Sequence, residues 1–208
     1  MMIVGMSSRT RGELNISADN NSKATNNGQL ICDIFSDPEA FARLYRRHYD
    51  VVFRYCVHRL FEREAAEDVT SVVFLKVVEN IDRFKGTEQQ FRNWLYKIAT
   101  NAVNGYLRKT ARRNRLLKFA GEQITNEFGD CKEIADENAE KLACLKQAML
   151  TLKPKYQTII TLHFFENLKL TEIAEVLGNS SGTVRSQLAR AIAKLREKLA
   201  TEVTEILD

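Results

Sequence analysis

The sequence predicts an all-α fold of two small helical domains joined by an acidic linker. Three observations support this prediction. Apolar residues recur at three- and four-residue steps along most of the chain, which is the period of an amphipathic helix. No segment alternates apolar and polar residues as a half-buried strand does. Two prolines and nine glycines in 208 residues leave long stretches without helix breakers.

Composition narrows the class of protein. The chain is 44% hydrophobic and 28% charged, which is typical of a globular protein. No apolar run approaches the roughly 18 residues that a membrane-spanning helix needs, and the first residues lack the apolar core of a signal peptide. We therefore expect a cytoplasmic protein with no membrane insertion. The net charge of +4 is too small to indicate nucleic-acid binding by itself, so the distribution of charge matters more.

The first domain is expected over residues 34–118. Residues 1–33 are rich in Asn, Ser and Thr and are expected to form a disordered N-terminal extension. Ser36 can cap a helix whose first turn contains Pro38, and apolar residues then recur through Cys56. Two more helices are predicted, the second of them ending in a basic stretch: residues 64–81 and 90–115.

Residues 119–138 are interpreted as the linker. Around them, the stretch 121–141 has seven acidic residues against two lysines and few apolar anchors. Such a composition favours a connection between two compact units. We therefore expect the domains to bury little surface against each other, so that only a partner fixes their relative position. Limited proteolysis is expected to cut the free protein first within 121–141.

The second domain, residues 139–208, is predicted to contain four helices. The first two are expected at about residues 142–152 and 156–165. The last two come from LTEIAEVLGNSSGTVRSQLARAIAKL, where Thr171 can cap a short apolar helix and Gly178 permits a turn with positive φ. A helix-turn-helix needs this arrangement.

The last helix has an inner and an outer side. Val184 and Leu188 anchor it inward, which leaves Arg185, Ser186 and Arg190 on or near the outer surface. Arginine can bridge two acceptors on a guanine edge or grip a phosphate, and serine near the start of a helix can reach either. The sequence therefore predicts that this helix contacts DNA, in preference to being a merely solvated basic face.

Ordered stretches of the chain resemble one family. AEDVTSVVFLKVVENIDRF at 66–84 and FRNWLYKIATNAVNGYLR at 91–108 resemble the second conserved region of bacterial sigma factors, and residues 152–199 resemble the fourth. With only these two regions and a short linker, the chain resembles an extracytoplasmic-function (ECF) sigma factor over about residues 38–199. The resemblance implies a protein that binds core RNA polymerase, directs it to the −10 and −35 promoter elements and helps to open the DNA.

The resemblance also implies three binding surfaces. The helix at 68–81 would dock on the polymerase clamp, with Asp68, Ser71, Val72 and Leu75 as contact residues. The third helix and the loop before it would hold the single-stranded −10 element through Phe84, Lys85, Gly86, Lys97, Asn101, Arg108 and Arg112. The helix-turn-helix would hold the duplex −35 element through Thr183, Arg185, Ser186, Arg190 and Lys194. Trp94 is interpreted as a core residue, with stacking on a base as the alternative.

The implied partners are the clamp and flap of core polymerase, promoter DNA and an anti-sigma factor; no homo-oligomer is indicated. Five positions depart from the family's pattern. Ser71-Val72 stands where Gln-Glu is common, Gly105 where Asp is frequent, and His163 where Arg or Lys is frequent. Pro154 lies one residue later than usual. These departures bear on docking and affinity.

Two other functions are compatible with parts of the sequence. A stand-alone helix-turn-helix regulator would bind duplex operators without polymerase. An enzyme would need a motif such as GxSxG, a P-loop or HExxH, and the sequence contains none of them. The three histidines are scattered and the four cysteines have no metal-ligand spacing, so neither a metal nor a cofactor is expected and the thiols are expected to be unpaired.

Overall fold

The computed structural model describes residues 38–119 and 137–207, and every element in these ranges is helical, which confirms the all-α prediction. The first unit contains α2 (Pro38–Leu60), α3 (Arg63–Asn80), the 3₁₀ turn η1 (Ile81–Arg83) and α4 (Glu88–Phe119). The second contains α5 (Glu137–Thr151), α6 (Pro154–Ile160), the π-helical turn η2 (Thr161–Phe165), α7 (Leu170–Leu177) and α8 (Ser181–Leu207). None of the described helices is long and apolar enough to cross a membrane.

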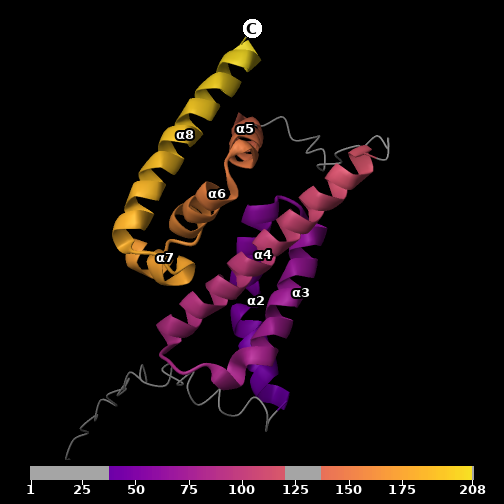
Figure 1. Ribbon diagram of the computed structural model, residues 1–208, viewed down its shortest axis with the longest axis vertical. Helices are drawn as coiled ribbons and strands as arrows, with labels where there is room; N and C mark the ends of the chain where they lie inside the picture. The colour runs from indigo at the N-terminus through magenta and orange to yellow at the C-terminus, as the bar shows by residue number, and fades with distance from the viewer. Residues whose placement is uncertain (1–37, 120–136, 208) are drawn as a thin grey trace, which may run out of the picture.

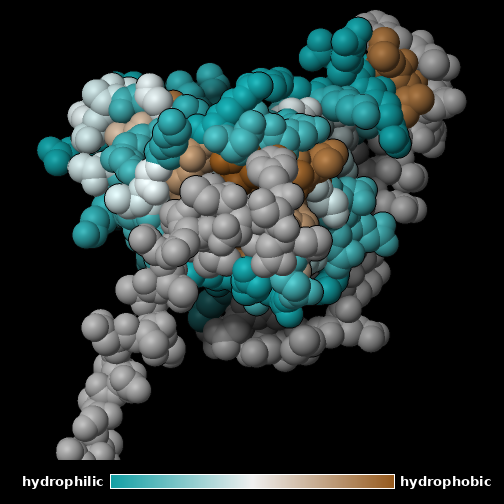
Figure 2. Space-filling model, turned by 90° about the horizontal axis from the view of Figure 1, so that it is seen from below, coloured by the Kyte–Doolittle hydropathy of each residue, from teal (hydrophilic) through white to brown (hydrophobic). Residues whose placement is uncertain are grey.

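Some sequence predictions fall outside the described residues. These are the N-terminal extension at 1–33, the capping role of Ser36 and most of the linker at 119–138. Within the described part of the chain, Cys56 is a buried free thiol, as expected, and Cys144 is half-buried. In Figure 2, most of the described residues that are visible are hydrophilic, and hydrophobic residues are visible in a central band and at one edge.

The first unit is a bundle in which α2, α3 and α4 pack against one another. Proline suits the first turn of a helix, where its missing N–H needs no partner, and α2 begins at Pro38 as predicted. Helix α4 begins earlier than expected, because the Thr87 N–H donates to Gln90 Oε1 at 2.8 Å and the Gln90 N–H to Thr87 Oγ1 at 3.3 Å. This reciprocal pair is a capping box, which stabilises the first turn.

The second unit packs α5, α6 and α7 against the long helix α8. The predicted helix at 156–165 is confirmed in outline, although it begins at Pro154 and its last turn widens to the π-helical η2. The Glu166 N–H donates to the Thr161 carbonyl at 3.0 Å and closes that turn. The chain then reaches α7 through Asn167, whose φ of 55° lies in the left-handed region.

The two units pack closely, and the expectation that they bury little surface against each other is wrong. Helix α7 lies against α4, and η2 lies against α2 (Figure 1). Ile173 and Val176 of α7 belong to the same buried cluster as Phe91 and Leu95 of α4. The acidic stretch has few apolar residues, but the contact is made by helices that follow it in the chain.

Candidate nucleic-acid interface

The helix-turn-helix is formed by α7, the turn at Gly178 and the first half of α8. Gly178 has a φ of 65°, as the sequence predicted. The Asn179 N–H donates to the Ala174 carbonyl at 2.9 Å, and the Gly178 N–H donates to the Glu175 carbonyl at 3.3 Å. These two bonds satisfy carbonyls that the end of a helix leaves free, and they fix the direction in which the chain leaves α7.

The predicted cap of α7 is wrong by two residues. The cap is Lys169, whose N–H donates to the Glu172 carboxylate at 2.6 Å, and Thr171 lies exposed in the first turn. The carboxylate three residues into the helix supplies the cap that Thr171 was expected to give. Glu172 is also favourable there because the N-terminal end of a helix attracts negative charge.

Helix α8 has the inner and outer sides that the sequence predicted. Val184, Leu188 and Ala191 are buried. The residues predicted to contact the −35 element are all exposed: Thr183, Arg185, Ser186, Arg190 and Lys194. The hydroxyl of Ser180 accepts the Thr183 N–H at 3.1 Å, and this cap orients the exposed face from the first turn onward.

The side chains on this face differ in how many of their hydrogen-bonding groups are available to a ligand. The Ser186 hydroxyl donates to the Thr183 carbonyl at 2.9 Å, which leaves its oxygen lone pairs to accept a bond from a ligand. Arg185 and Arg190 have no ion-pair or hydrogen-bond partner within the described residues. Their guanidinium groups are therefore available for a bidentate contact.

A second candidate surface is a hollow of about 290 Å³ between α3 and α4, which we call the α3–α4 hollow. It is lined by Lys76, Asn80, Trp94, Lys97, Ile98 and Asn101. Two of the predicted −10 residues, Lys97 and Asn101, lie together in it. The hollow thus combines ammonium groups, side-chain amides and an aromatic ring, which are the groups that hold an unstacked base and its phosphates.

Trp94 takes part in both the core and this hollow. Its ring centroid lies 5.2 Å from that of Phe84 and 5.6 Å from that of Phe91, so one side of the indole packs against the first unit. The sequence interpretation of Trp94 as a core residue is therefore correct but incomplete. Phe84 is half-buried beneath the indole and supports it from the loop side.

The remaining predicted −10 residues lie outside the α3–α4 hollow. Lys85 and Gly86 are exposed in the loop before α4. A Cβ at Gly86 would lie 2.7 Å from Gln90 Oε1 and 3.0 Å from the Phe84 ring, so a side chain there would displace the Gln90 amide that caps α4. Arg108 and Arg112 are exposed two and three turns beyond Asn101 on α4.

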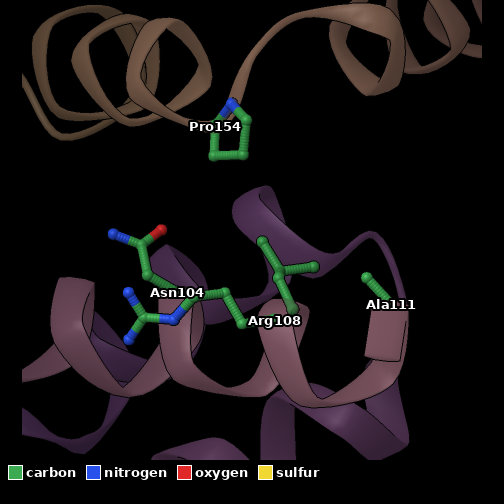
Figure 3. A pocket seen from close by; sticks show the side chains of 5 residues that line it. Asn104, Arg108, Ala111 and Pro154 are labelled. Atoms are coloured by element: carbon green, nitrogen blue, oxygen red, sulfur yellow. The ribbon is translucent and has the colours of Figure 1, made fainter. Parts of the chain in front are cut away.

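Arg108 lines a different hollow, of about 320 Å³, between α4 and α6. Figure 3 shows Asn104, Arg108 and Ala111 on one side of it and Pro154 facing them from the other unit. The sequence prediction grouped Arg108 with Lys97 and Asn101, but the structure does not bring it into the same hollow.

Helix α3 has two faces of different character. Val69, Val73, Phe74 and Val77 are buried in the bundle. The four residues predicted to dock on polymerase are all exposed: Asp68, Ser71, Val72 and Leu75. Val72 is 44% exposed and Leu75 60% exposed, which is unusual for side chains of this kind. The Ser71 hydroxyl donates to the Glu67 carbonyl at 3.1 Å, so this face presents two apolar side chains, Val72 and Leu75, beside the carboxylate of Asp68.

Comparison with known proteins identifies the family. Residues 44–113 match the family described as Sigma-70 region 2, and residues 142–195 match Sigma-70, region 4. The chain is 31% identical over 170 residues to the ECF RNA polymerase sigma factor SigW of Bacillus subtilis, covering 78% of this chain and 90% of SigW. This chain belongs to the ECF RNA polymerase sigma factors. It is also 32% identical over 169 residues to BldN of Streptomyces coelicolor, covering 78% of this chain but spanning only 61% of BldN.

Solved structures agree on the fold of this sigma factor. CnrH, solved in complex with the cytosolic domain of CnrY, is 21% identical with a TM-score of 0.59, over 83% of this chain and 96% of CnrH. The sigma factor RpoE from Bartonella quintana, solved with the anti-sigma factor NepR, is 19% identical with a TM-score of 0.56, over 77% of this chain and 96% of RpoE.

Sequence reasoning missed a polar cluster between the two units of the sigma factor. The side chain of Glu166 is fully buried and contacts Arg54, His58 and Tyr96. Burial raises the pKa of Glu166, but bonds from His58, Arg54 and Tyr96 outweigh it and hold the pKa below its ordinary value. Burial raises the pKa of Tyr96, and the adjacent Glu166 raises it further, so the phenol stays a donor.

A second buried contact joins the units beside this cluster. Arg59 donates to Gln157 Oε1 at 2.6 Å and to Asn104 Oδ1 at 3.1 Å, and its side chain is almost fully buried. The one available signal in the sequence was Arg59 and Gln157 standing within otherwise apolar stretches. This pattern does not identify the residues that Arg59 contacts, because many polar or acidic residues elsewhere in the chain could pair with it equally well.

The remaining departures from the family's pattern have structural counterparts. His163 Nδ1 lies 3.1 Å from the Leu168 carbonyl, so the imidazole holds the loop before α7. Gly105 lies within α4, and a Cβ there would have no neighbour within 4 Å. No described group of three or more His, Cys, Asp or Glu side chains has the arrangement of a metal site.

Proposed function

We propose that this sigma factor docks on core RNA polymerase through the exposed face of α3 and recognises promoters with its two DNA-facing surfaces. The single observation that carries the proposal is their arrangement in one chain. On α3, the exposed side chains of Val72 and Leu75 adjoin a cationic, amide-bearing hollow, and a helix-turn-helix presents exposed arginines. A stand-alone regulator has no use for the first two features.

The α3–α4 hollow suits one unpaired base of the −10 element. In this proposal the base stacks on the exposed side of Trp94, the Asn101 amide bonds to its edge, and Lys97 holds the adjoining phosphate. Gly86 lets the backbone of the loop approach the strand closely, because it has no side chain, and the Lys85 ammonium adds positive charge beside it. Arg108 and Arg112 then follow the phosphates leading away from the hollow.

The helix-turn-helix suits the duplex −35 element. Thr183, Ser186 and the two arginines lie at the N-terminal half of α8, which is the part of a recognition helix that enters the major groove. Lys194 lies farther along the helix and would contact phosphate. The polymerase, in the cytoplasm, would carry out RNA synthesis. This chain would recognise the promoter and help to separate the strands. CnrH and RpoE were solved with CnrY and an anti-sigma factor, and we propose an anti-sigma partner here as well.

A forked promoter probe tests the base-binding role of the hollow. Run-off transcription with core polymerase first supplies a promoter, whose −10 strand is then left single-stranded and carries 2-aminopurine at one position at a time. Stacking on Trp94 should quench the fluorescence at one position in the complex with polymerase. Asn101→Ala should weaken binding by roughly 1 kcal/mol, because it removes one hydrogen bond.

The controls of this experiment separate the alternatives. Lys146→Ala, on α5 and away from all three surfaces, should bind like the unchanged protein. Equal quenching at every position, or unchanged binding by Asn101→Ala, would show that the α3–α4 hollow does not bind a base of the −10 element. Tight binding to the duplex alone without polymerase would favour the stand-alone regulator instead.

A further inference from the structure

The interface between the two units is centred on one buried carboxylate. Among the described residues, the side chain of Glu166, in the second unit, is bonded only by the first: by Arg54 at 3.1 Å and Tyr96 at 2.9 Å, with His58 Nδ1 at 3.3 Å. Its side chain has no exposed surface. A buried carboxylate is stable only while it is paired and hydrogen-bonded. Glu166 therefore stabilises the packed arrangement and contributes nothing through its side chain to the fold of its own unit.

Two other polar contacts cross the same interface. Arg59 donates to Gln157 Oε1, and Asn93 of α4 donates to Glu175 Oε2 of α7 at 2.6 Å. The apolar side chains of Ile173 and Val176 complete the contact. The interface is thus mixed in character, and units joined in this way separate more readily than units joined by an apolar core.

The packed arrangement cannot meet both promoter elements at once. The −10 and −35 elements lie about 25 base pairs apart, which is about 85 Å along B-form DNA. A compact chain of this length is only about 45 Å across. The α3–α4 hollow and the outer face of α8 therefore cannot reach their elements together until α7 leaves α4.

We propose that the Glu166 cluster is a latch that holds the sigma factor closed and that must open before both promoter elements are bound. The two DNA-facing surfaces are those of the proposed function. The effect of the latch on transcription rests on that function, whereas the opening and closing of the free protein does not. Neither DNA-facing surface is covered in the closed form. What the latch controls is their separation. The exposed face of α3 remains open, so polymerase can dock first and promoter engagement can follow.

Single-molecule energy transfer in the full-length free protein tests the latch. Non-natural residues at the exposed positions Glu79 on α3 and Ala193 on α8 carry the dyes and avoid the cysteines. The unchanged protein should show one high-efficiency population. Glu166→Gln places an amide donor among three donors, so the ratio of open to closed molecules should rise roughly 10- to 100-fold. Tyr96→Phe removes one bond and should act in the same direction to a smaller extent.

A matched substitution provides the control. Glu67→Gln removes an exposed ion pair with Arg63 within α3 and should leave the distribution unchanged. Circular dichroism should show equal helicity in all variants, because Glu166 contacts only the other unit. If Glu166→Gln and Tyr96→Phe both keep the closed distribution with helicity intact, the latch is wrong. An open distribution in the unchanged free protein would overturn it equally.

A second arm adds core polymerase and promoter DNA. Both should move the unchanged protein to low efficiency, and Glu166→Gln should form open complexes faster. One outcome separates the two proposals. If the free protein is closed and opens in Glu166→Gln, but no promoter is bound, then the proposed function is wrong and the latch is correct. Promoter-specific transcription while the protein remains at high efficiency would overturn the latch alone.

Discussion

At the scale of single residues, the outward arginines of α8 are the side chains best suited to read base pairs. We predict that Arg185→Ala and Arg190→Ala each weaken −35 binding by roughly 1–3 kcal/mol if the arginine makes a bidentate base contact. Lys194→Ala should instead lower affinity evenly across sequences and reduce the salt slope by about one, because it would lose a phosphate contact. Transcription from promoters with intact and scrambled −35 elements measures the difference.

The arginine substitutions should leave the fold intact, since Val184, Leu188 and Ala191 rather than the arginines are buried. Circular dichroism checks this point. Lost helicity in the arginine variants would mean that these side chains are structural, and full activity with unchanged −35 preference would remove the recognition role from α8.

His48 gives a prediction about pH. It is 8% exposed and its ring lies 5.2 Å from that of Phe91. Burial, and then Arg47, lower its pKa from 6.5 to about 4, with Glu88 opposing them. Between these values the unfolded chain binds a proton that the folded chain does not, so the free energy of unfolding falls as the pH falls. The loss should reach roughly 2 kcal/mol at pH 5 relative to pH 7.

Urea unfolding at pH 7 and pH 5 measures this effect, and both conditions lie above the range in which most carboxylates titrate. His48→Gln should flatten the dependence, whatever it does to the stability at pH 7. An equal fall with pH in the variant would show that another group carries the effect.

Residue-level prediction from the sequence succeeded where one helix decides the outcome. Val184 and Leu188 face inward and Arg185 faces outward because their spacing along α8 requires it, and Gly178 adopts positive φ because the turn does. It failed for Glu166, whose burial depends on residues more than 60 positions earlier in the chain. Nothing in the local sequence of an acidic residue after an apolar turn distinguishes a buried carboxylate from a solvated one.

At the scale of single elements, the exposed face of α3 leads to a prediction about binding to core polymerase. Its face carrying Val72 and Leu75 has no covering element in the described structure. Leu75→Ser should weaken binding to core polymerase about tenfold, because a leucine that becomes buried on binding contributes about 1.5 kcal/mol or more. Its free energy of unfolding should hardly change, since the side chain is already exposed.

Leu142→Ser is the matched control, because Leu142 is a similarly exposed leucine on α5. A polymerase-binding titration by fluorescence anisotropy compares the two variants. Equal weakening by both, or no weakening by Leu75→Ser, would contradict the docking role of α3.

A glycine inside helix α4 leads to a prediction about the free energy of unfolding. Gly105 lies in its interior, and a Cβ there would meet nothing within 4 Å. Gly105→Ala should therefore raise the free energy of unfolding by about 1 kcal/mol, because alanine loses less backbone entropy in a helix. Ala111→Gly, farther along the same helix, should lower it by a similar amount. Urea unfolding measures both, and a destabilised Gly105→Ala would indicate a contact that α4 makes only with glycine.

Element boundaries were predicted best where a single residue type fixes them. Pro38 begins α2 as expected, since proline fits a first turn. The start of α4 was placed too late, although Thr87 and Gln90 carry the spacing of a capping box. The cap of α7 was assigned to Thr171 because threonine is a common cap, whereas Glu172 reaches back to Lys169.

At the scale of the whole molecule, two amphipathic units were predictable and their contact was not. The periodicity of α7 shows that one face is buried, but α8 and α4 are equally suitable to cover it. The structure uses both, since α7 packs against α8 and against α4. A sequence alone therefore gives the halves of this sigma factor, and only the structure gives the closed arrangement that the latch would hold.

Run-off transcription with core RNA polymerase and genomic DNA, with and without this protein, tests the central claim most directly. We predict discrete transcripts that appear only when both the protein and core polymerase are present, and that are lost in Leu75→Ser at low polymerase concentration. The contradicting result is a protein that binds no core polymerase at micromolar concentration and binds a duplex operator equally well without it.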